Sequence, residues 1–326
     1  IFTNQLHDIT FDNSFYADKS VFVFGNVFYC MGSGIKSRST TVPFNTTLFQ
    51  NRLSVNATPF YMNGTEITTD VNKVSNATIK DNFGNTYIVN DGLTSIKKGA
   101  NYCMAYIEHG NIIDNAKYGY AWLVQADDQQ INQYKSGSPI QVLKQDETAH
   151  AVYHTEEKIL AASVFKANVE VGIKQIRQVS TPIIVMMKEK EGGNYDVAFT
   201  NPDMDRSISP VFNNDNVNNI VEAVPGNYST ISIQLNGTFE NCDPSNPVSV
   251  TSVNGITTIS YDSSHDGETY RVSLKNVGTG IHDTEKEAVK VLLHDGELSV
   301  NFSELCTHSI ELIDINGQVL KKIQAD

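Results

Sequence analysis

A glutamate and a histidine at the end of one predicted strand have the residue types of acid–base chemistry. Glu108 and His109 close the β-type run that begins at Tyr102. As a bare pair they match a general base with its orienting carboxylate. No nucleophile or second acid accompanies them, so we interpret them as polar groups that satisfy loop backbone at a strand end. A self-sufficient enzyme that uses Glu108 and His109 is the alternative.

Two further sets of residues have the types of metal ligands. His150 and His154 are four positions apart, which would align them on a helix. In this β-type context the even spacing puts both on one strand face, where exposed polar positions are expected. Oxygen ligands for calcium are offered by Asp81, Asn82, Asn85, Asn90 and Asp91. They lack the pattern of a known calcium loop, so we expect these side chains to form hydrogen bonds within turns and not to bind a metal ion. We also expect that the chain requires no cofactor. A structural calcium ion is an unsupported alternative.

The cysteines and the single tryptophan are expected to be structural. None of the cysteines has the spacing of a zinc site, and they stand at Cys30, Cys103, Cys242 and Cys306. We predict buried, inert thiols at Cys30 and Cys103, while a disulfide between any pair is left open. Trp122 could stack on a sugar ring, but its apolar neighbours favour core packing.

These residues are positioned by a chain of short strands that begins with a hairpin. Two apolar runs, Ser20–Phe24 and Val27–Met31, are separated only by Gly25-Asn26, which is a strong signal for a tight turn. Val21 to Phe24 are apolar without a break, where a one-sided strand would alternate. We therefore expect the hairpin to lie between two layers of a stacked-sheet core.

The remaining chain continues this pattern. A helix is expected only after Asp127, a suitable N-cap, with Ile131 and Tyr134 on one face. Further strands are predicted at Thr46–Phe49, Pro59–Met62, Thr65–Thr68, Thr86–Val89, Tyr102–Glu108, Tyr118–Val124, Ile140–Leu143, Ala149–Tyr153, Ile159–Phe165, Ile173–Val179, Ile183–Lys188, Tyr195–Thr200, Thr230–Leu235, Val248–Val253, Thr257–Tyr261, Tyr270–Leu274, Val289–Leu293, Glu297–Phe302, Ser309–Asp314 and Gln318–Ile323. Asn316-Gly317 predicts a hairpin turn between the last two. Polar loops, which could hold a cation but are expected to be solvated, occur at Asp203–Arg206 and Asn213–Asn219.

Several of these motifs, in this order, resemble the β-sandwich portion of polysaccharide lyase family eight, the chondroitin and hyaluronate lyases. The resemblance begins with the hairpin from Lys19 to Ile35 and the TTLFQ strand at Thr46–Gln50, and the TTLFQ form is most similar to the chondroitinase ABC type. The resemblance covers roughly residues 11 to 205 and continues through Tyr106–Gly110, Tyr118–Leu123, Ile140–Leu143 and Thr181–Met186.

The resemblance implies an all-β fold, with a large antiparallel sandwich of the galactose-mutarotase-like super-sandwich type followed by a smaller one. At 326 residues the chain also exceeds the usual size of a single core. We place the central sandwich, incomplete at its N-terminal side, at residues 1–181 and the C-terminal sandwich at 182–285. The boundary follows Ser180-Thr181-Pro182, because proline cannot continue a strand interior. Residues 286–326 form a terminal β unit.

The chemistry that the resemblance implies is β-elimination at a uronic acid in chondroitin sulfate, dermatan sulfate or hyaluronan. It requires a neutralised carboxylate, a base at C5 and a proton donor for the departing O4. In family-eight lyases these roles fall to a His, a Tyr and an Arg on an N-terminal helical toroid and a Glu just before the hairpin. None of these motifs is present, so we assign no catalytic residue, and the substrate-binding residues are unknown at this stage. We expect the non-catalytic, β-rich part of a lyase, inactive alone; a carbohydrate-binding or structural module is the alternative.

Charge and the chain ends set the remaining expectations. A net charge of −13 argues against nucleic acid and anionic membranes as partners, and no apolar run is long enough for a membrane helix. The chain starts at Ile1 without a signal peptide, which indicates a processed, trimmed or partial sequence. Its tail, Asp295–Leu298 with Ile310–Val319, resembles the first part of the sorting domain of Bacteroidetes type IX secretion. We therefore expect a bacterial protein that is periplasmic, on the cell surface or secreted.

Overall fold

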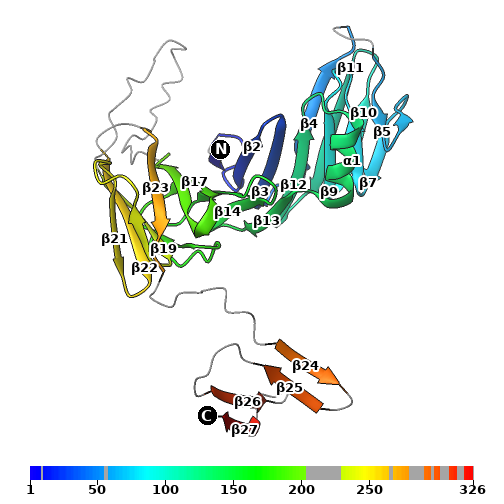
Figure 1. The fold of residues 1–326 in the computed structure, drawn as a ribbon. Coiled ribbons are helices and arrows are strands. Elements are labelled where there is room, and N and C mark those ends of the chain that lie inside the picture. Colours follow the sequence, from blue (N-terminus) through cyan, green and yellow to red (C-terminus); the bar gives the residue numbers. More distant parts are fainter. Residues whose placement is uncertain are drawn as a thin grey trace. The chain divides into compact units, whose positions relative to one another are not determined.

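The computed structural model contains two compact units, Ile1–Val277 and Gly278–Asp326 (Figure 1). It describes residues 1–326 except 9, 55–57, 203–228, 264–266, 279–289, 295–296, 302–307, 314–318 and 326. Nearly all of the described secondary structure is antiparallel strand, which confirms the predicted all-β class. The polar loops predicted at Asp203–Arg206 and Asn213–Asn219 lie outside the described residues.

Two sheets form the first sandwich of the larger unit. The eight-stranded sheet contains, in spatial order, β1 (Phe2–His7), β2 (Tyr16–Phe24), β3 (Val27–Ser37), β12 (Ile113–Leu123), β9 (Thr86–Asp91), β8 (Ala77–Lys80), β5 (Tyr61–Met62) and β6 (Thr65–Glu66). The four-stranded sheet contains β4 (Phe44–Arg52), β11 (Tyr102–Gly110), β10 (Leu93–Lys98) and β7 (Val71–Val74). Between them lies a core that includes Phe49, Ile79, Val89 and Ile107.

The hairpin β2–β3 has apolar side chains on both faces, as the sequence predicted. Its tight turn pairs Phe24 with Val27, and Gly25 has a φ of 58°, which suits glycine at the first position of a two-residue turn. Phe22 belongs to one core, whereas Cys30 on the neighbouring strand belongs to the core of the first sandwich. The hairpin therefore lies between two layers, because each of its faces is covered by a different set of elements.

Two more sheets form the second sandwich. The seven-stranded sheet contains, in spatial order, β13 (Ile140–Gln145), β14 (Ala149–His154), β15 (Ile159–Val164), β17 (Ile183–Glu189), β18 (Tyr195–Thr200), β23 (Tyr270–Asn276) and β20 (Phe239–Asn241). The four-stranded sheet contains β16 (Ile176–Val179), β19 (Ser229–Asn236), β22 (Ile256–Ser263) and β21 (Ser249–Val253). A short 3-10 turn, Glu191–Gly193, joins β17 to β18. The core between these sheets includes Leu160, Val185, Phe199 and Ile233.

The strand pairing does not follow the domain boundary predicted at Ser180-Thr181-Pro182. Strand β15 precedes that point and β17 follows it, yet they are neighbours in one sheet, with Val164 opposite Ile183. Pro182 lies immediately before β17, where its missing N–H removes no bond from the strand interior. The proline therefore marks a crossing between the two sheets of one sandwich, and the strands of this sandwich begin at β13.

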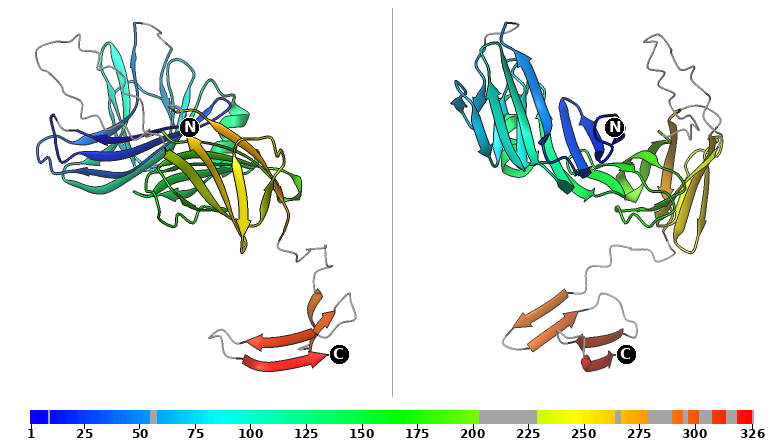
Figure 2. Two further views of the ribbon diagram at one scale, coloured as in Figure 1. Left: turned by 90° about the vertical axis from the view of Figure 1, so that its left-hand side faces the viewer. Right: turned by 180° about the vertical axis from the view of Figure 1, so that it is seen from behind.

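A third core joins the two sandwiches. It contains Phe22 and Leu123 from the eight-stranded sheet, Val152 from β14 and Tyr134 from the helix α1 (Asp128–Gly137). The predicted helix is confirmed, since the carboxylate of its N-cap Asp127 accepts a hydrogen bond from the Gln130 N–H at 2.8 Å. Figure 2 shows the sheets from two further sides.

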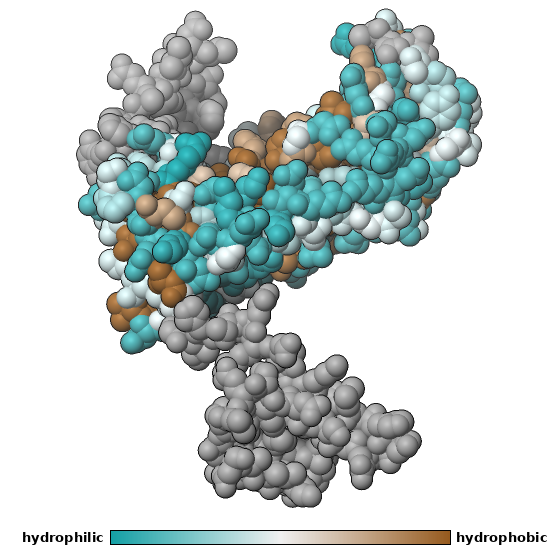
Figure 3. Space-filling view, in the orientation of Figure 1, coloured by the Kyte–Doolittle hydropathy of each residue, from teal (hydrophilic) through white to brown (hydrophobic). Residues whose placement is uncertain are grey.

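The surface of the larger unit is mostly hydrophilic in the view of Figure 3, with hydrophobic residues gathered in a few places. Phe2 is 60% exposed and lies on β1, the edge strand of the eight-stranded sheet. Across the described ranges, we find no helix that is long and apolar enough to span a membrane.

The smaller unit consists of two hairpins. One pairs β24 (Lys290–His294) with β25 (Glu297–Asn301), and the other pairs β26 (His308–Ile313) with β27 (Val319–Ala325). All four strands were predicted from the sequence. The turn predicted at Asn316-Gly317 lies outside the described residues.

Candidate functional site

Glu108 and His109 do not form a catalytic pair. As neighbours on β11 they project to opposite faces of the sheet. Glu108 accepts a hydrogen bond from the Ser95 hydroxyl and lies 3.9 Å from Lys73 Nζ. His109 Nε2 lies 2.8 Å from Thr46 Oγ1, and burial lowers the pKa of its ring. The strand-end interpretation therefore fits the contacts of both residues, since each is held by a separate set of partners.

His150 and His154 share one face of β14, but the prediction that they are exposed was wrong. His150 is fully buried, and His154 is 6% exposed and packs against the ring of Phe24. The His150 ring joins the two sandwiches, because its Nδ1 lies 2.9 Å from Ser20 Oγ and its Nε2 lies 2.9 Å from Ser33 Oγ. Burial lowers the pKa of His150 to about 4, so the ring is neutral.

The other candidate ligands and sugar contacts have structural roles. Trp122 packs in the first sandwich against Phe28, with ring centroids 4.8 Å apart. Cys30 and Cys103 are buried and unpaired, and burial raises the pKa of each thiol to about 11. Asp81 Oδ1 accepts hydrogen bonds from backbone N–H groups within its own turn, as turn chemistry predicts. Among the described residues, no group of His, Cys, Asp and Glu side chains could hold a metal ion.

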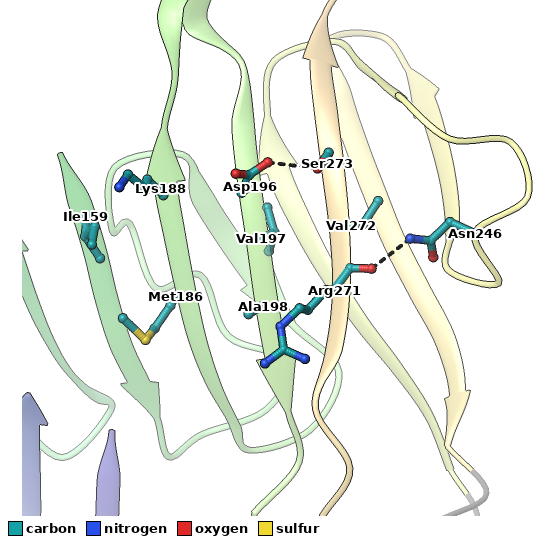
Figure 4. Close-up of a pocket in the computed structure, with 10 residues that line it drawn as sticks. All are labelled: Ile159, Met186, Lys188, Asp196, Val197, Ala198, Asn246, Arg271, Val272 and Ser273. Carbon is teal, nitrogen blue, oxygen red and sulfur yellow. Dashed lines mark hydrogen bonds between the residues drawn. The ribbon is translucent and has the colours of Figure 1, made fainter. Parts of the chain in front are cut away.

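A groove of about 520 Å³ lies on the face of the seven-stranded sheet that points away from its own core (Figure 4). The pairing of the strands places the lining side chains of the groove in two rows. Lys188, Asp196 and Ser273 are cross-strand neighbours on β17, β18 and β23. One step along the same face, Met186, Ala198 and Arg271 form the second row. The groove thus combines a small apolar floor with polar and charged side chains from three strands.

The carboxylate of the groove is already paired. Asp196 Oδ2 lies 2.6 Å from Lys190 Nζ, and Asp196 Oδ1 accepts a hydrogen bond from the Ser273 hydroxyl at 2.8 Å. The hydrogen bonds from Lys190 and Ser273, together with the nearby charge of Lys188, lower the pKa of Asp196, so it stays ionised. Lys188 and Arg271 form no ion pair with any carboxylate in the described part of the chain. Two exposed cations therefore face solvent across the apolar floor.

A second cleft, of about 500 Å³, lies where β1, β2 and β3 meet the loop before β14. Its charges are compensated within the cleft, because Glu147 Oε1 lies 2.5 Å from Lys36 Nζ and Glu147 Oε2 lies 3.9 Å from Lys166 Nζ. Asp18 accepts a hydrogen bond from Gln5 Nε2 at 3.0 Å, and burial raises the pKa of its carboxyl group. With two carboxylates beside two cations, this cleft lacks the unpaired positive charge of the groove.

Comparison with known proteins identifies the fold. Residues 141–208 match the model of the polysaccharide lyase family 8 C-terminal beta-sandwich domain, and the match begins inside β13. A curated relative, the chondroitin sulfate ABC endolyase of Proteus vulgaris, is 22% identical over 269 residues, which make up 73% of this chain and 24% of the relative. The predicted relationship to polysaccharide lyase family 8 is confirmed.

Solved lyases share the fold of the chain. A Paenibacillus xanthan lyase superposes with a TM-score of 0.67 at 16% identity, covering 96% of this chain and 31% of that one. A chondroitinase AC lyase gives a TM-score of 0.58 at 17% identity, covering 83% of this chain and 39% of that one. The chondroitin AC lyase of Streptomyces coelicolor gives 0.59 at 13% identity, covering 84% and 34%. The chain thus spans well under half the length of these lyases.

The sequence did not single out the groove residues. Alternation along Ile183–Lys188 and Tyr195–Thr200 does indicate that Lys188 and Asp196 each project to the face of the strand opposite its buried residues. It does not indicate that Arg271, from a strand much later in the chain, completes the same surface. Only the pairing of β18 with β23 places Arg271 beside Ala198.

Proposed function

We propose that this chain is the β-rich, non-catalytic part of a glycosaminoglycan lyase that acts by β-elimination at the uronic acid. The observation that carries the proposal is the family 8 match at residues 141–208, supported by a lyase fold over nearly the whole chain. The relationship to a chondroitin sulfate ABC endolyase favours chondroitin sulfate or dermatan sulfate as the substrate, with hyaluronan as a further candidate.

The contacts of the described titratable residues support the proposal that this part has no turnover on its own. Proton abstraction from C5 needs a base that reaches substrate, together with a group that neutralises the adjacent carboxylate. His150 is held between two serine hydroxyls inside the protein, away from any substrate. Glu108 and His109 point to opposite faces of β11. The catalytic groups therefore belong to another part of the protein, for which a helical toroid on the N-terminal side is our proposed partner.

The proposal extends to location, since a lyase that degrades an extracellular polysaccharide must meet its substrate outside the cytoplasm. We place the protein in the periplasm, on the cell surface or outside the bacterial cell.

Turnover assays on two forms of the protein test the proposal. The 326-residue chain and the protein recovered from its native source are each incubated with chondroitin sulfate, dermatan sulfate and hyaluronan, and the unsaturated uronate is followed by ultraviolet absorbance. The intact mass of the native protein is measured alongside. We expect a native mass well above 36.0 kDa, with turnover by the native protein and none by the chain alone.

Two other results would contradict the proposal in different ways. Turnover by the chain alone, abolished in a folded Glu108→Gln variant, would place the chemistry on this chain. Absence of turnover by both forms would favour the second candidate, a carbohydrate-binding module without catalysis. The unpaired cations of the groove are the specific observation that supports this second candidate.

A further inference from the structure

The groove on the seven-stranded sheet has the charge pattern of an anion-binding surface in an otherwise acidic protein. The chain carries a net charge of −13, which disfavours association with anions overall. In the groove the balance is reversed locally, because the single carboxylate of Asp196 is shared: it pairs with Lys190 and also lies opposite Lys188, while Arg271 forms no ion pair among the described residues. A ligand that enters the groove therefore meets three cations, Lys188, Lys190 and Arg271, that share one carboxylate.

The spacing of two of these charges suits an extended ligand. Lys188 and Arg271 lie on strands separated by one intervening strand, β18, and are offset by two residues along the sheet. Neighbouring strands are about 4.8 Å apart and each residue rises about 3.4 Å, so the two α-carbons lie about 12 Å apart. Two cations whose α-carbons are this far apart can each contact a different negative group of a short anionic chain.

The floor and rim of the groove add contacts that suit a sugar. Met186 and Ala198 provide an apolar floor between the two cations, as Figure 4 shows, and the C–H faces of a pyranose ring can pack on such a surface. At the rim, the Ser273 hydroxyl donates to Asp196, and Asn246 donates to the Arg271 carbonyl. Asp196 and Asn246 thus contact β23 at Ser273 and Arg271, the two β23 residues that line this face of the groove.

We propose that this groove is a non-catalytic binding site for an acidic saccharide, with Lys188 and Arg271 contacting carboxylate or sulfate groups on successive sugars. The site lies on the second sandwich and acts without any turnover step. The choice of chondroitin sulfate as the probe rests on the proposed function, but the charge argument does not. Guanidinium and ammonium groups bind such anions through charge-assisted hydrogen bonds, and arginine can contact two oxygens at once.

Binding of a labelled chondroitin sulfate oligosaccharide to the 326-residue chain tests the charges. The double variant K188Q/R271Q removes both cations, while K80Q/R38Q makes the same change in net charge at exposed positions of the first sandwich. We expect the first variant to bind at least about tenfold more weakly than the wild type and the second to bind like the wild type. Binding should also weaken as salt is raised, because the cations are exposed. Thermal melting confirms that each variant is folded.

The position of the ligand is tested by the methyl signals of the chain's six methionines. Met186 lies on the groove floor, whereas Met31 is fully buried in the core that joins the two sandwiches. With methyl-labelled methionine, and a Met186→Leu variant for assignment, the oligosaccharide should shift the Met186 signal and leave that of Met31 in place.

Three results would refute the proposal that the groove is a binding site for an acidic saccharide. They are absence of binding by the wild type, equal binding by the two double variants, and binding that leaves the Met186 signal unchanged. An uncharged dextran of similar length serves as the negative probe, and binding of dextran equal to that of chondroitin sulfate would also refute the role of charge. None of these results bears on the proposed lyase function, which is tested separately by the turnover of the chain and of the native protein.

Discussion

Acid sensitivity of the joint between the two sandwiches is the prediction that follows most directly from the structure. His150 is fully buried on β14, and its two ring nitrogens contact Ser20 and Ser33 from the hairpin β2–β3. A neutral ring satisfies both contacts, with one nitrogen donating and the other accepting. Protonation would place a charge in a buried site and remove the accepting nitrogen. The folded state therefore resists binding this proton.

The magnitude follows from the pKa of His150, which is lowered from 6.5 to about 4 by burial. Because the folded pKa lies below the unfolded one, the stabilising contribution is fully present above pH 6.5 and is lost as the pH falls toward 4. Linkage between these two values gives a loss of about 2 kcal/mol in the free energy of unfolding between pH 7 and pH 5. Below pH 4 the loss levels off.

Urea unfolding of the wild type and of His150→Gln at pH 7 and pH 5 measures this contribution. Fluorescence of Trp122, the only tryptophan, reports on the first sandwich, which holds both serines. At pH 7 the variant should be less stable by about 1–3 kcal/mol, because the glutamine amide does not reproduce the rigid ring that places one nitrogen 2.9 Å from each serine hydroxyl. Between pH 7 and pH 5 the wild type should lose about 2 kcal/mol more than the variant. Equal losses with unchanged denaturant slopes would refute the argument that the buried ring is neutral.

Three further predictions concern packing and helix capping, all measured by urea unfolding. Phe22→Ala should cost about 3–5 kcal/mol, because the fully buried ring lies in the core that joins the sandwiches; a cost below about 1 kcal/mol would show that the joint is loosely packed. Gly32→Ala should be destabilising by about 1–3 kcal/mol, since its new methyl group would overlap the Tyr118 ring, and a second change, Tyr118→Leu, should recover part of the loss if this overlap is the cause. Asp127→Ala should cost about 1 kcal/mol through loss of the helix cap, whereas Asp127→Asn should retain most of the stability.

Much of the fold was predictable because its signals are local. The two-residue turn at Gly25-Asn26, the unbroken apolar run in β2 and the N-cap at Asp127 each depend on residues that are close in the sequence. The resemblance to polysaccharide lyase family 8 was likewise visible in the sequence, because it rests on short motifs in a particular order. Alternation along a strand also explains why Glu108 and His109 separate, since adjacent strand residues project to opposite faces.

The sequence by itself determined the strands and the helix, because these depend on periodicity and short-range order, and its motifs carried the resemblance to polysaccharide lyase family 8. Tertiary structure decided what each strand face meets. It buried His150 under the hairpin, although the same alternation would also suit an exposed face, and it paired β15 with β17 across the predicted boundary. It also brought Lys188 and Arg271 onto one groove. A period of two fixes only the side of the sheet to which a residue points, and the order of the strands fixes its neighbours.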